Sequence, residues 1–212
     1  MPKVTEAHLD ARRKQILDAA EACFSRQGFH QTSMQDICRE ASLSPGAVYR
    51  YFSSKEDIVA ASCRACQQDN VDFIQSLTAN GSSAIGMLDR LVDLGFGHLA
   101  DPESIDHILM NIQLWAEAQR SPEIMDAYRE SHQKTWQDGL TDILLRGQEL
   151  GEIDPDLDAE SMARILMSSF QGLMLQKSLD PDIDVLGYAA TLRLVYHRAF
   201  STVVGASGEL RT

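Results

Sequence analysis

Residues 32–52 read TSMQDICREASLSPGAVYRYF and predict two short helices with a tight turn between them. The first helix is expected over about 34–41, because Thr32 and Gln35 fit a capping box. In such a box the Thr32 hydroxyl accepts the Gln35 amide proton, while the Gln35 side chain reaches back to the cap. The sequence thus predicts where the first short helix begins.

The second short helix is expected over about 45–52. Ser44 followed by Pro45 is typical of a helix start, because the serine caps the first turn and proline fits its first position. Helices of two turns bury too little surface to be stable alone, so the two must be held together by packing. Such a pair, joined by three or four residues, is a helix-turn-helix.

The two sides of the second helix differ in character. Val48 and Phe52 are four residues apart, so they share a face with Ile37 and Leu43 as apolar partners. Small residues on another face allow close approach to a DNA major groove, and an arginine there can donate two hydrogen bonds to guanine. The residues of that face are Gly46, Ala47 and Arg50. The side chains suited to phosphates are Tyr49, Tyr51, Ser33, Ser44 and Lys55.

This region resembles the DNA-binding domain of the TetR family over roughly residues 10–60. The resemblance is carried by TSMQDIC at 32–38, ASLSPGAVYRYF at 41–52 and SKE at 54–56. It implies a dimeric regulator, usually a repressor, in which a small ligand in the C-terminal domain moves two DNA heads apart and releases the operator. By matching positions it implies these DNA contacts: Ser33, Gln35, Ser44, Pro45, Gly46, Ala47, Tyr49, Arg50, Tyr51 and Lys55.

Three positions depart from the pattern of that family. Gln35 stands where the family often has arginine or another polar residue, and Pro45 and Ala47 stand where lysine and threonine are frequent. These departures leave the operator sequence open and remove a basic contact at position 45. A helix-turn-helix used only for packing is the alternative, and it is disfavoured because small, hydroxyl and cationic residues all fall on one face.

The net charge of −12 argues at first against a polyanionic partner. Its distribution is uneven, since residues 1–55 hold eight Lys and Arg against six Asp and Glu, whereas residues 56–212 hold eleven against twenty-five. Only the N-terminal quarter can approach DNA comfortably, and the acidic remainder should lie away from phosphate.

Helical periodicity runs through the chain, which predicts an all-α fold of about nine helices. The other helices are expected at about 9–27, 53–77, 83–99, 102–119, 122–150, 158–178 and 184–203. The expected domains are a DNA-binding domain at 1–56, a helical ligand-binding and dimerisation domain at 57–205, and a disordered tail at 206–212. The N-terminus lacks the pattern of a secretory signal and no apolar run is long enough to span a bilayer, so a cytoplasmic location is expected.

The last two predicted helices are apolar on nearly every side, over about 159–178 and 184–203. One face of each can pack on its own domain and the other on a second copy, which gives a four-helix bundle with two-fold symmetry. A homodimer of this kind would bind a near-palindromic operator.

Inducer contacts are sought among polar residues on otherwise apolar helices. These candidates are His107, Asn111, Trp115, Gln171 and Met174, with His98 as a further one. The ordinary alternative is that each is a satisfied core or surface group. The acidic balance slightly favours a neutral or cationic inducer, and no cofactor is expected.

Other functions leave no matching pattern in the sequence. An all-helical enzyme would need a catalytic constellation, which is not visible. His98 and His107 are not expected to form a metal site. Cys63 and Cys66 lack a second ligand pair, so packing is the expected role of the cysteines. A C-terminal half that binds a protein partner instead of a small ligand remains an alternative.

Overall fold

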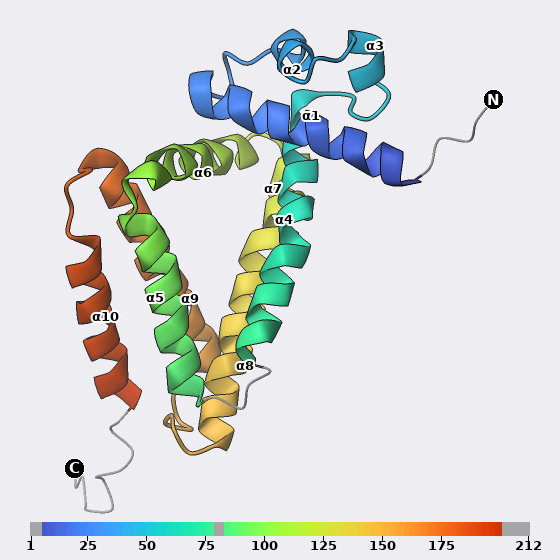
Figure 1. The fold of residues 1–212 in the computed structure, drawn as a ribbon. Coiled ribbons are helices and arrows are strands. Elements are labelled where there is room, and N and C mark those ends of the chain that lie inside the picture. Colours follow the sequence, from blue (N-terminus) through green and yellow to red (C-terminus); the bar gives the residue numbers. More distant parts are fainter. Residues whose placement is uncertain (1–5, 79–82, 201–212) are drawn as a thin grey trace, which may run out of the picture. The chain divides into compact units, whose positions relative to one another are not determined.

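The computed structural model describes residues 6–78 and 83–200 of the chain, and this part contains helices and turns without strands (Figure 1). The all-α prediction is therefore confirmed. The α-helices are α1 (Glu6–Gln27), α2 (Met34–Glu40), α3 (Pro45–Val48), α4 (Lys55–Thr78), α5 (Ala84–Ala100), α6 (Ile105–Ala118), α7 (Pro122–Tyr128), α8 (Thr135–Glu149), α9 (Ala159–Leu179) and α10 (Val185–Phe200). A 3₁₀-helix, η1 (Pro102–Ser104), precedes α6, and a π-helix, η2 (Arg129–Lys134), separates α7 from α8.

The chain forms two compact units that are each built from two stretches of sequence. The first unit combines Met1–Gln68 with Asp106–His132, and the second combines Asp69–Ile105 with Gln133–Thr212. The first unit thus contains most of α6 and all of α7 in addition to the segment expected as a DNA-binding domain. The tail expected at 206–212 lies outside the described residues.

The core of the first unit is formed by apolar side chains of the first four helices together with α6 and α7. Ile16 on α1, Ile37 on α2 and Ile58 on α4 have no exposed surface, and Phe52 is almost as deeply buried. Their burial is the main stabilising contribution, because a fully buried side chain of this size contributes about 1.5–3 kcal/mol. The three cysteines Cys23, Cys38 and Cys63 belong to the same core, and the side chain of Cys66 lies outside the described part.

The second unit is a bundle in which α10 packs on α5 and α8 packs on α9. A polar cluster joins α5 to α10, where the Asp89 carboxylate accepts hydrogen bonds from the Tyr196 hydroxyl at 2.5 Å and from His197 Nε2 at 2.8 Å. Burial alone would raise the pKa of the Asp89 carboxyl, but these hydrogen bonds together with the nearby positive charge of Arg193 outweigh burial and lower it. The cluster therefore holds a charged carboxylate between two helices.

Three local predictions differ from the structure. The helix expected over 122–150 is divided into α7, η2 and α8. The second short helix ends at Val48 instead of about 52, because the Tyr51 amide bonds the Val48 carbonyl three residues back and tightens the last turn. The capping box begins one residue later than predicted, as described below. No described helix is long and apolar enough to cross a membrane.

Candidate nucleic-acid interface

The start of α2 is fixed by Ser33 and Asp36. The Asp36 amide donates to Ser33 Oγ at 3.2 Å, and the Ser33 amide donates to Asp36 Oδ2 at 2.9 Å, which completes a capping box. The predicted box of Thr32 and Gln35 is wrong, because the Thr32 hydroxyl instead donates to the Gly28 carbonyl at 2.8 Å. The hydrogen bonds from Ser33, first from its hydroxyl and then from its amide, lower the pKa of the Asp36 carboxyl.

The turn between α2 and α3 places Ser42 in the left-handed region, with a φ of 54°. The Leu43 amide then reaches back to the Cys38 carbonyl at 3.0 Å, and the Ser42 amide to the Arg39 carbonyl at 3.1 Å. These bonds satisfy carbonyls that the end of α2 leaves open, as in other left-handed helix ends. The turn therefore sets the direction in which α3 leaves α2.

Helix α3 is capped by Ser44, whose Oγ accepts the Ala47 amide at 3.3 Å. Val48 and Phe52 are buried, which confirms the predicted core face. Outside that face the side chains predicted to meet base edges and phosphates lie at the surface. Pro45, Gly46, Tyr49 and Arg50 are exposed, as are Ser33, Gln35 and Ser44, whereas Ala47, Tyr51 and Lys55 are half-buried.

The environment of Gly46 shows how open this surface is. A Cβ added at Gly46 would meet no atom within 4 Å, so the helix start lies clear of the rest of the described protein. Tyr49, in the turn that follows, keeps 53% of its surface exposed, which is unusual for an aromatic side chain in a helical head. The surface formed by these residues can therefore approach another molecule closely.

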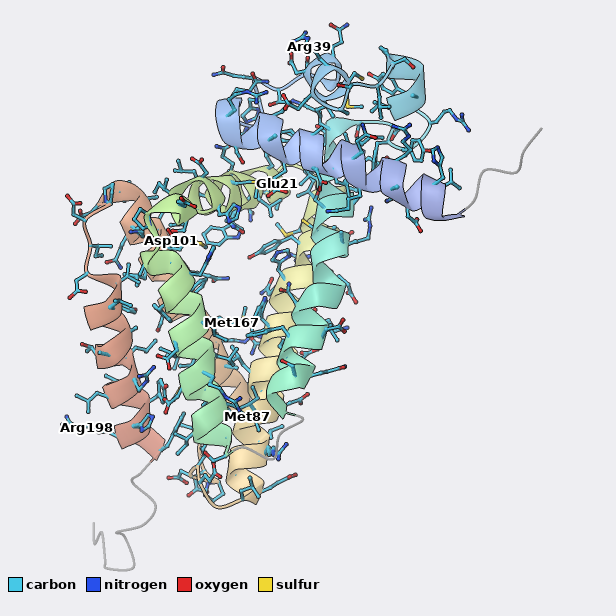
Figure 2. All side chains as sticks on the ribbon, viewed as in Figure 1. Glu21, Arg39, Met87, Asp101, Met167 and Arg198 are labelled. Atoms are coloured by element: carbon cyan, nitrogen blue, oxygen red, sulfur yellow. The ribbon has the colours of Figure 1, made fainter. Side chains whose placement is uncertain are left out.

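Two basic side chains near this surface are not among the DNA contacts predicted from the sequence. Arg39 on α2 points away from α1 and is exposed, with an ion pair to Asp36 at 3.2 Å (Figure 2). The Arg13 guanidinium of α1 lies 4.8 Å from the centre of the Phe52 ring, next to the end of the α3 turn. The basic run at residues 12–14 was visible in the sequence, but only the fold shows that one member reaches the helix-turn-helix.

The loop between α1 and α2 is held from both sides through the Phe29 backbone. Lys55 Nζ donates to the Phe29 carbonyl at 2.7 Å and lies 4.4 Å from the centre of its ring, and the Phe29 amide donates to Gln113 Oε1 at 3.0 Å. Beside it, His30 Nε2 lies 2.7 Å from a Glu117 carboxylate oxygen on α6. These contacts, which we call the Phe29 clamp, join α4 and α6 to the helix-turn-helix and carry no signal in the sequence.

The candidate inducer residues fall into two groups. His107, Asn111 and Trp115 follow one another at intervals of four along α6, where the Asn111 side chain donates to the His107 carbonyl at 2.9 Å and Trp115 Nε1 donates to the Tyr128 hydroxyl at 2.8 Å. Gln171 and Met174 lie on α9 in the second unit, half-buried and buried respectively. His107, Asn111 and Trp115 thus share one face of α6, and Gln171 and Met174, three residues apart, share one face of α9.

Comparison with known proteins places this surface in a family. The model for the N-terminal domain of bacterial regulatory proteins of the tetR family matches residues 16–62, and the model "BetI-type transcriptional repressor, C-terminal" matches residues 87–199, more than half of the chain. The chain is 27% identical to the HTH-type transcriptional regulator YfiR of Bacillus subtilis over 199 residues, which is 91% of this chain and 94% of that protein.

The similarity to two further proteins extends over most of the length of each. The HTH-type transcriptional repressor AcnR of Corynebacterium diphtheriae is 25% identical, with 88% of this chain and 91% of that protein covered. The crystal structure of FadR from Bacillus subtilis in complex with stearoyl-CoA has a similar fold, with a TM-score of 0.74, 22% identity, and 88% and 98% of the two chains covered. The matches of the family models show that the chain belongs to the TetR family, whose members are helix-turn-helix transcriptional regulators and not enzymes.

Proposed function

We propose that this regulator is a repressor that binds a near-palindromic operator as a homodimer and leaves it when a small molecule binds. The observation that carries the DNA-binding part is the division of α3 and its following turn into a buried face, with Val48 and Phe52, and an exposed face, with Gly46 and Arg50. A helix of this kind can place its small residues against base edges while the arginine reaches a guanine.

The hydroxyl groups of the two caps have different roles in this proposal. Ser44 Oγ accepts the Ala47 amide, so its own proton remains available for a phosphate oxygen. The Ser33 hydroxyl already donates to Asp36 Oδ2 at 2.6 Å, so it would position α2 and not bind phosphate in this state. One proton of the Lys55 ammonium is held by the Phe29 carbonyl, which leaves two for a phosphate. We infer that Ser44 and Lys55 set the register of the head on DNA.

Dimerisation would use α9 and α10, which carry large apolar side chains at the surface. Ile165 and Leu175 on α9 keep 55% and 46% of their surface exposed, and Leu186 and Leu194 on α10 keep 61% and 51%. Several large apolar side chains exposed on two helices favour an interface at this surface. Two copies related by a two-fold axis would cover these faces with each other in a four-helix bundle.

The inducer would bind within the segment 57–205, as a molecule that stabilises one arrangement of the two heads. The solved FadR structure has stearoyl-CoA bound, which supports a ligand role for a fold of this type. The acidic balance of this segment favours a neutral or cationic ligand over an anionic one. A regulator of this kind would act in the cytoplasm, where the chromosome lies.

Binding to the intergenic DNA upstream of the gene, followed by fluorescence anisotropy, tests the proposal. Arg50→Ala should cost about 1–3 kcal/mol of binding free energy and relax preference at one base pair, whereas Lys55→Ala should weaken binding to all sequences alike. Arg120→Ala is the matched control, because Arg120 is exposed in the same unit but far along the chain from α3. Equal affinities for wild type, Arg50→Ala and Arg120→Ala would show that the docking surface is wrongly assigned.

A further inference from the structure

The π-helix η2 (Arg129–Lys134) is the starting point for a second site. A π-helix is rare, and within longer helices it often coincides with a functional position. Here it follows Tyr128, the last residue of α7, and contains Ser131 and His132. Trp115 of α6 faces this segment through its bond to Tyr128, and all four residues belong to the first unit. We call these four side chains the π-helix cluster.

Besides the bond between Trp115 and Tyr128, the cluster is held by aromatic stacking and by two hydrogen bonds of Ser131. The Tyr128 and His132 rings lie 5.4 Å apart between centroids with 16° between their planes. Ser131 has no exposed surface, and its Oγ donates to the Ala127 carbonyl at 2.5 Å while lying 3.0 Å from His132 Nδ1. The orientation of the imidazole is thus fixed on one side by the serine and on one face by the tyrosine.

The single proton of the Ser131 hydroxyl determines which nitrogen of His132 carries hydrogen. Because that proton is given to the Ala127 carbonyl, Ser131 Oγ can only accept from His132, so Nδ1 must carry a proton. Burial lowers the pKa of His132, which keeps the ring neutral. A neutral ring protonated at Nδ1 has its lone pair at Nε2, so Nε2 is a hydrogen-bond acceptor.

Two hydrogen-bonding positions of the cluster are left unused. The Tyr128 oxygen accepts from Trp115 Nε1, but its own proton has no acceptor among the described residues, and burial raises the pKa of the hydroxyl so that the proton stays. His132 Nε2 also has no hydrogen-bond partner within the described ranges, and this nitrogen is not fully buried. It therefore still reaches accessible space.

We propose that the π-helix cluster binds an uncharged molecule that carries a hydroxyl group on a flat apolar body. The hydroxyl can donate to His132 Nε2 and accept from Tyr128, and the apolar body can pack against the aromatic rings. None of the four side chains carries a charge at neutral pH, so nothing in the cluster offsets the cost of desolvating a carboxylate or phosphate. The site rests on the proposed function only in that this ligand would be the inducer.

Binding can be measured without DNA through Trp115 itself. The chain has two tryptophans, so Trp136→Phe leaves Trp115 as the single reporter inside the cluster. In this background three probes are titrated while fluorescence is excited at the red edge of tryptophan absorption: para-butylphenol, para-butylanisole and para-butylbenzoate. They share a flat body, but only the phenol can donate a hydrogen bond, and only the benzoate is an anion.

The phenol should change Trp115 fluorescence saturably, and the anisole and benzoate should each bind about five- to ten-fold more weakly or not at all. His132→Phe, which keeps the aromatic stack and removes the acceptor, should abolish the preference for phenol. Tyr128→Phe removes the donor to the ligand oxygen, so it should weaken phenol and anisole alike, and it gives an independent variant if His132→Phe does not fold. His8→Phe, which replaces an exposed histidine near the start of α1, should leave the preference unchanged.

Three outcomes would overturn the site: no saturable change with phenol, equal binding of the benzoate, or no effect of the variants. The variants have no effect if a folded His132→Phe keeps the preference for phenol or, where it does not fold, if Tyr128→Phe binds phenol as tightly as wild type. Operator binding by the ligand-free His132→Phe protein is measured in parallel and should equal that of wild type. If every protein fails to bind DNA while phenol still binds, the proposed function fails and the site stands. If DNA binding is normal and phenol does not bind, only the site fails.

Discussion

Ser42 has a left-handed backbone, with a φ of 54°, although it carries a side chain. This conformation costs about 1–2 kcal/mol for an ordinary residue and more for a β-branched one. Ser42 already bears this strain, so Ser42→Val should lower the free energy of unfolding by the additional strain of a β-branched side chain, roughly 1 kcal/mol. Ser42→Gly, which accepts positive φ without strain, is the control and should match or exceed wild type. Chemical denaturation measures both, and equal stability of the two variants would contradict the strain.

Residue burial around the helix-turn-helix was predictable, but the cap was not. Val48 and Phe52 follow helical spacing, and both are buried as expected. At the start of α2, Thr32 and Ser33 both fit a capping position, so local sequence cannot decide between them. The choice is made by a contact with the preceding loop, since the Thr32 hydroxyl is held by the Gly28 carbonyl.

The capping box of α2 predicts a pH dependence at the scale of one element. Because hydrogen bonds from Ser33 lower the pKa of Asp36 in the folded state, its contribution to stability is fully present above the unfolded pKa. It is lost as the pH falls through the lower folded pKa. Asp36→Asn should therefore reduce stability at neutral pH, and the difference from wild type should shrink in acid.

Thermal unfolding of both proteins across acidic and neutral pH measures that difference. Asp126→Asn is a suitable control, because Asp126 is an exposed aspartate on α7, a helix whose N-terminus is capped by Ser121. A difference between Asp36→Asn and wild type that stays constant with pH would mean that the carboxylate charge does not act through the cap.

Close packing of α8 against α4 depends on Gly139. A Cβ built at Gly139 would lie 2.7 Å from Ile74 Cδ1 and 2.9 Å from Ile74 Cγ2. Gly139→Ala should therefore destabilise the protein by about 1–3 kcal/mol through overpacking. Gly97→Ala on α5, where a Cβ would meet nothing within 4 Å, should instead stabilise by about 0.5–1 kcal/mol. Denaturant midpoints with unchanged slopes would measure both, and similar signs for the two variants would contradict the packing.

The elements that sequence periodicity missed are the irregular ones. The π-helix η2 is only six residues long, too short to show a period of its own, so residues 122–150 could only be expected as one helix. For this reason the sequence predicts Trp115 as a candidate ligand contact but does not predict Tyr128 or His132. The structure adds them through the stacked rings and the Trp115 hydrogen bond.

At the scale of the whole molecule, the uneven charge predicted which part can meet DNA, but not how that part is held. The Phe29 clamp brings Lys55 of α4 and Gln113 of α6, distant in sequence, to one loop. Both backbone groups of Phe29 are thereby occupied, and the loop leads directly into α2. A change in α6 would reach the helix-turn-helix through these bonds, which is the physical connection that ligand control of operator binding requires.

The proposed dimer through α9 and α10 is tested by placing a charged side chain on its surface. Leu175 on α9 and Leu145 on α8 each keep 46% of their surface exposed, so lysine at either place should be tolerated in one subunit. In the dimer, Leu175→Lys would bury ammonium groups from both copies, and we expect the dimer dissociation constant to rise roughly 100-fold or more. Leu145→Lys should leave it unchanged.

Sedimentation equilibrium gives the dissociation constants, and anisotropy with operator DNA gives the consequence for binding. A Leu175→Lys monomer would contact one half-site only and lose the added affinity of two linked heads, so operator binding should fall with dimerisation. If Leu175→Lys remained dimeric, or if Leu145→Lys dissociated equally, the interface would lie elsewhere. If the variant became monomeric yet bound the operator as tightly as wild type, recognition would not depend on two-fold symmetry, and a near-palindromic operator would not be needed.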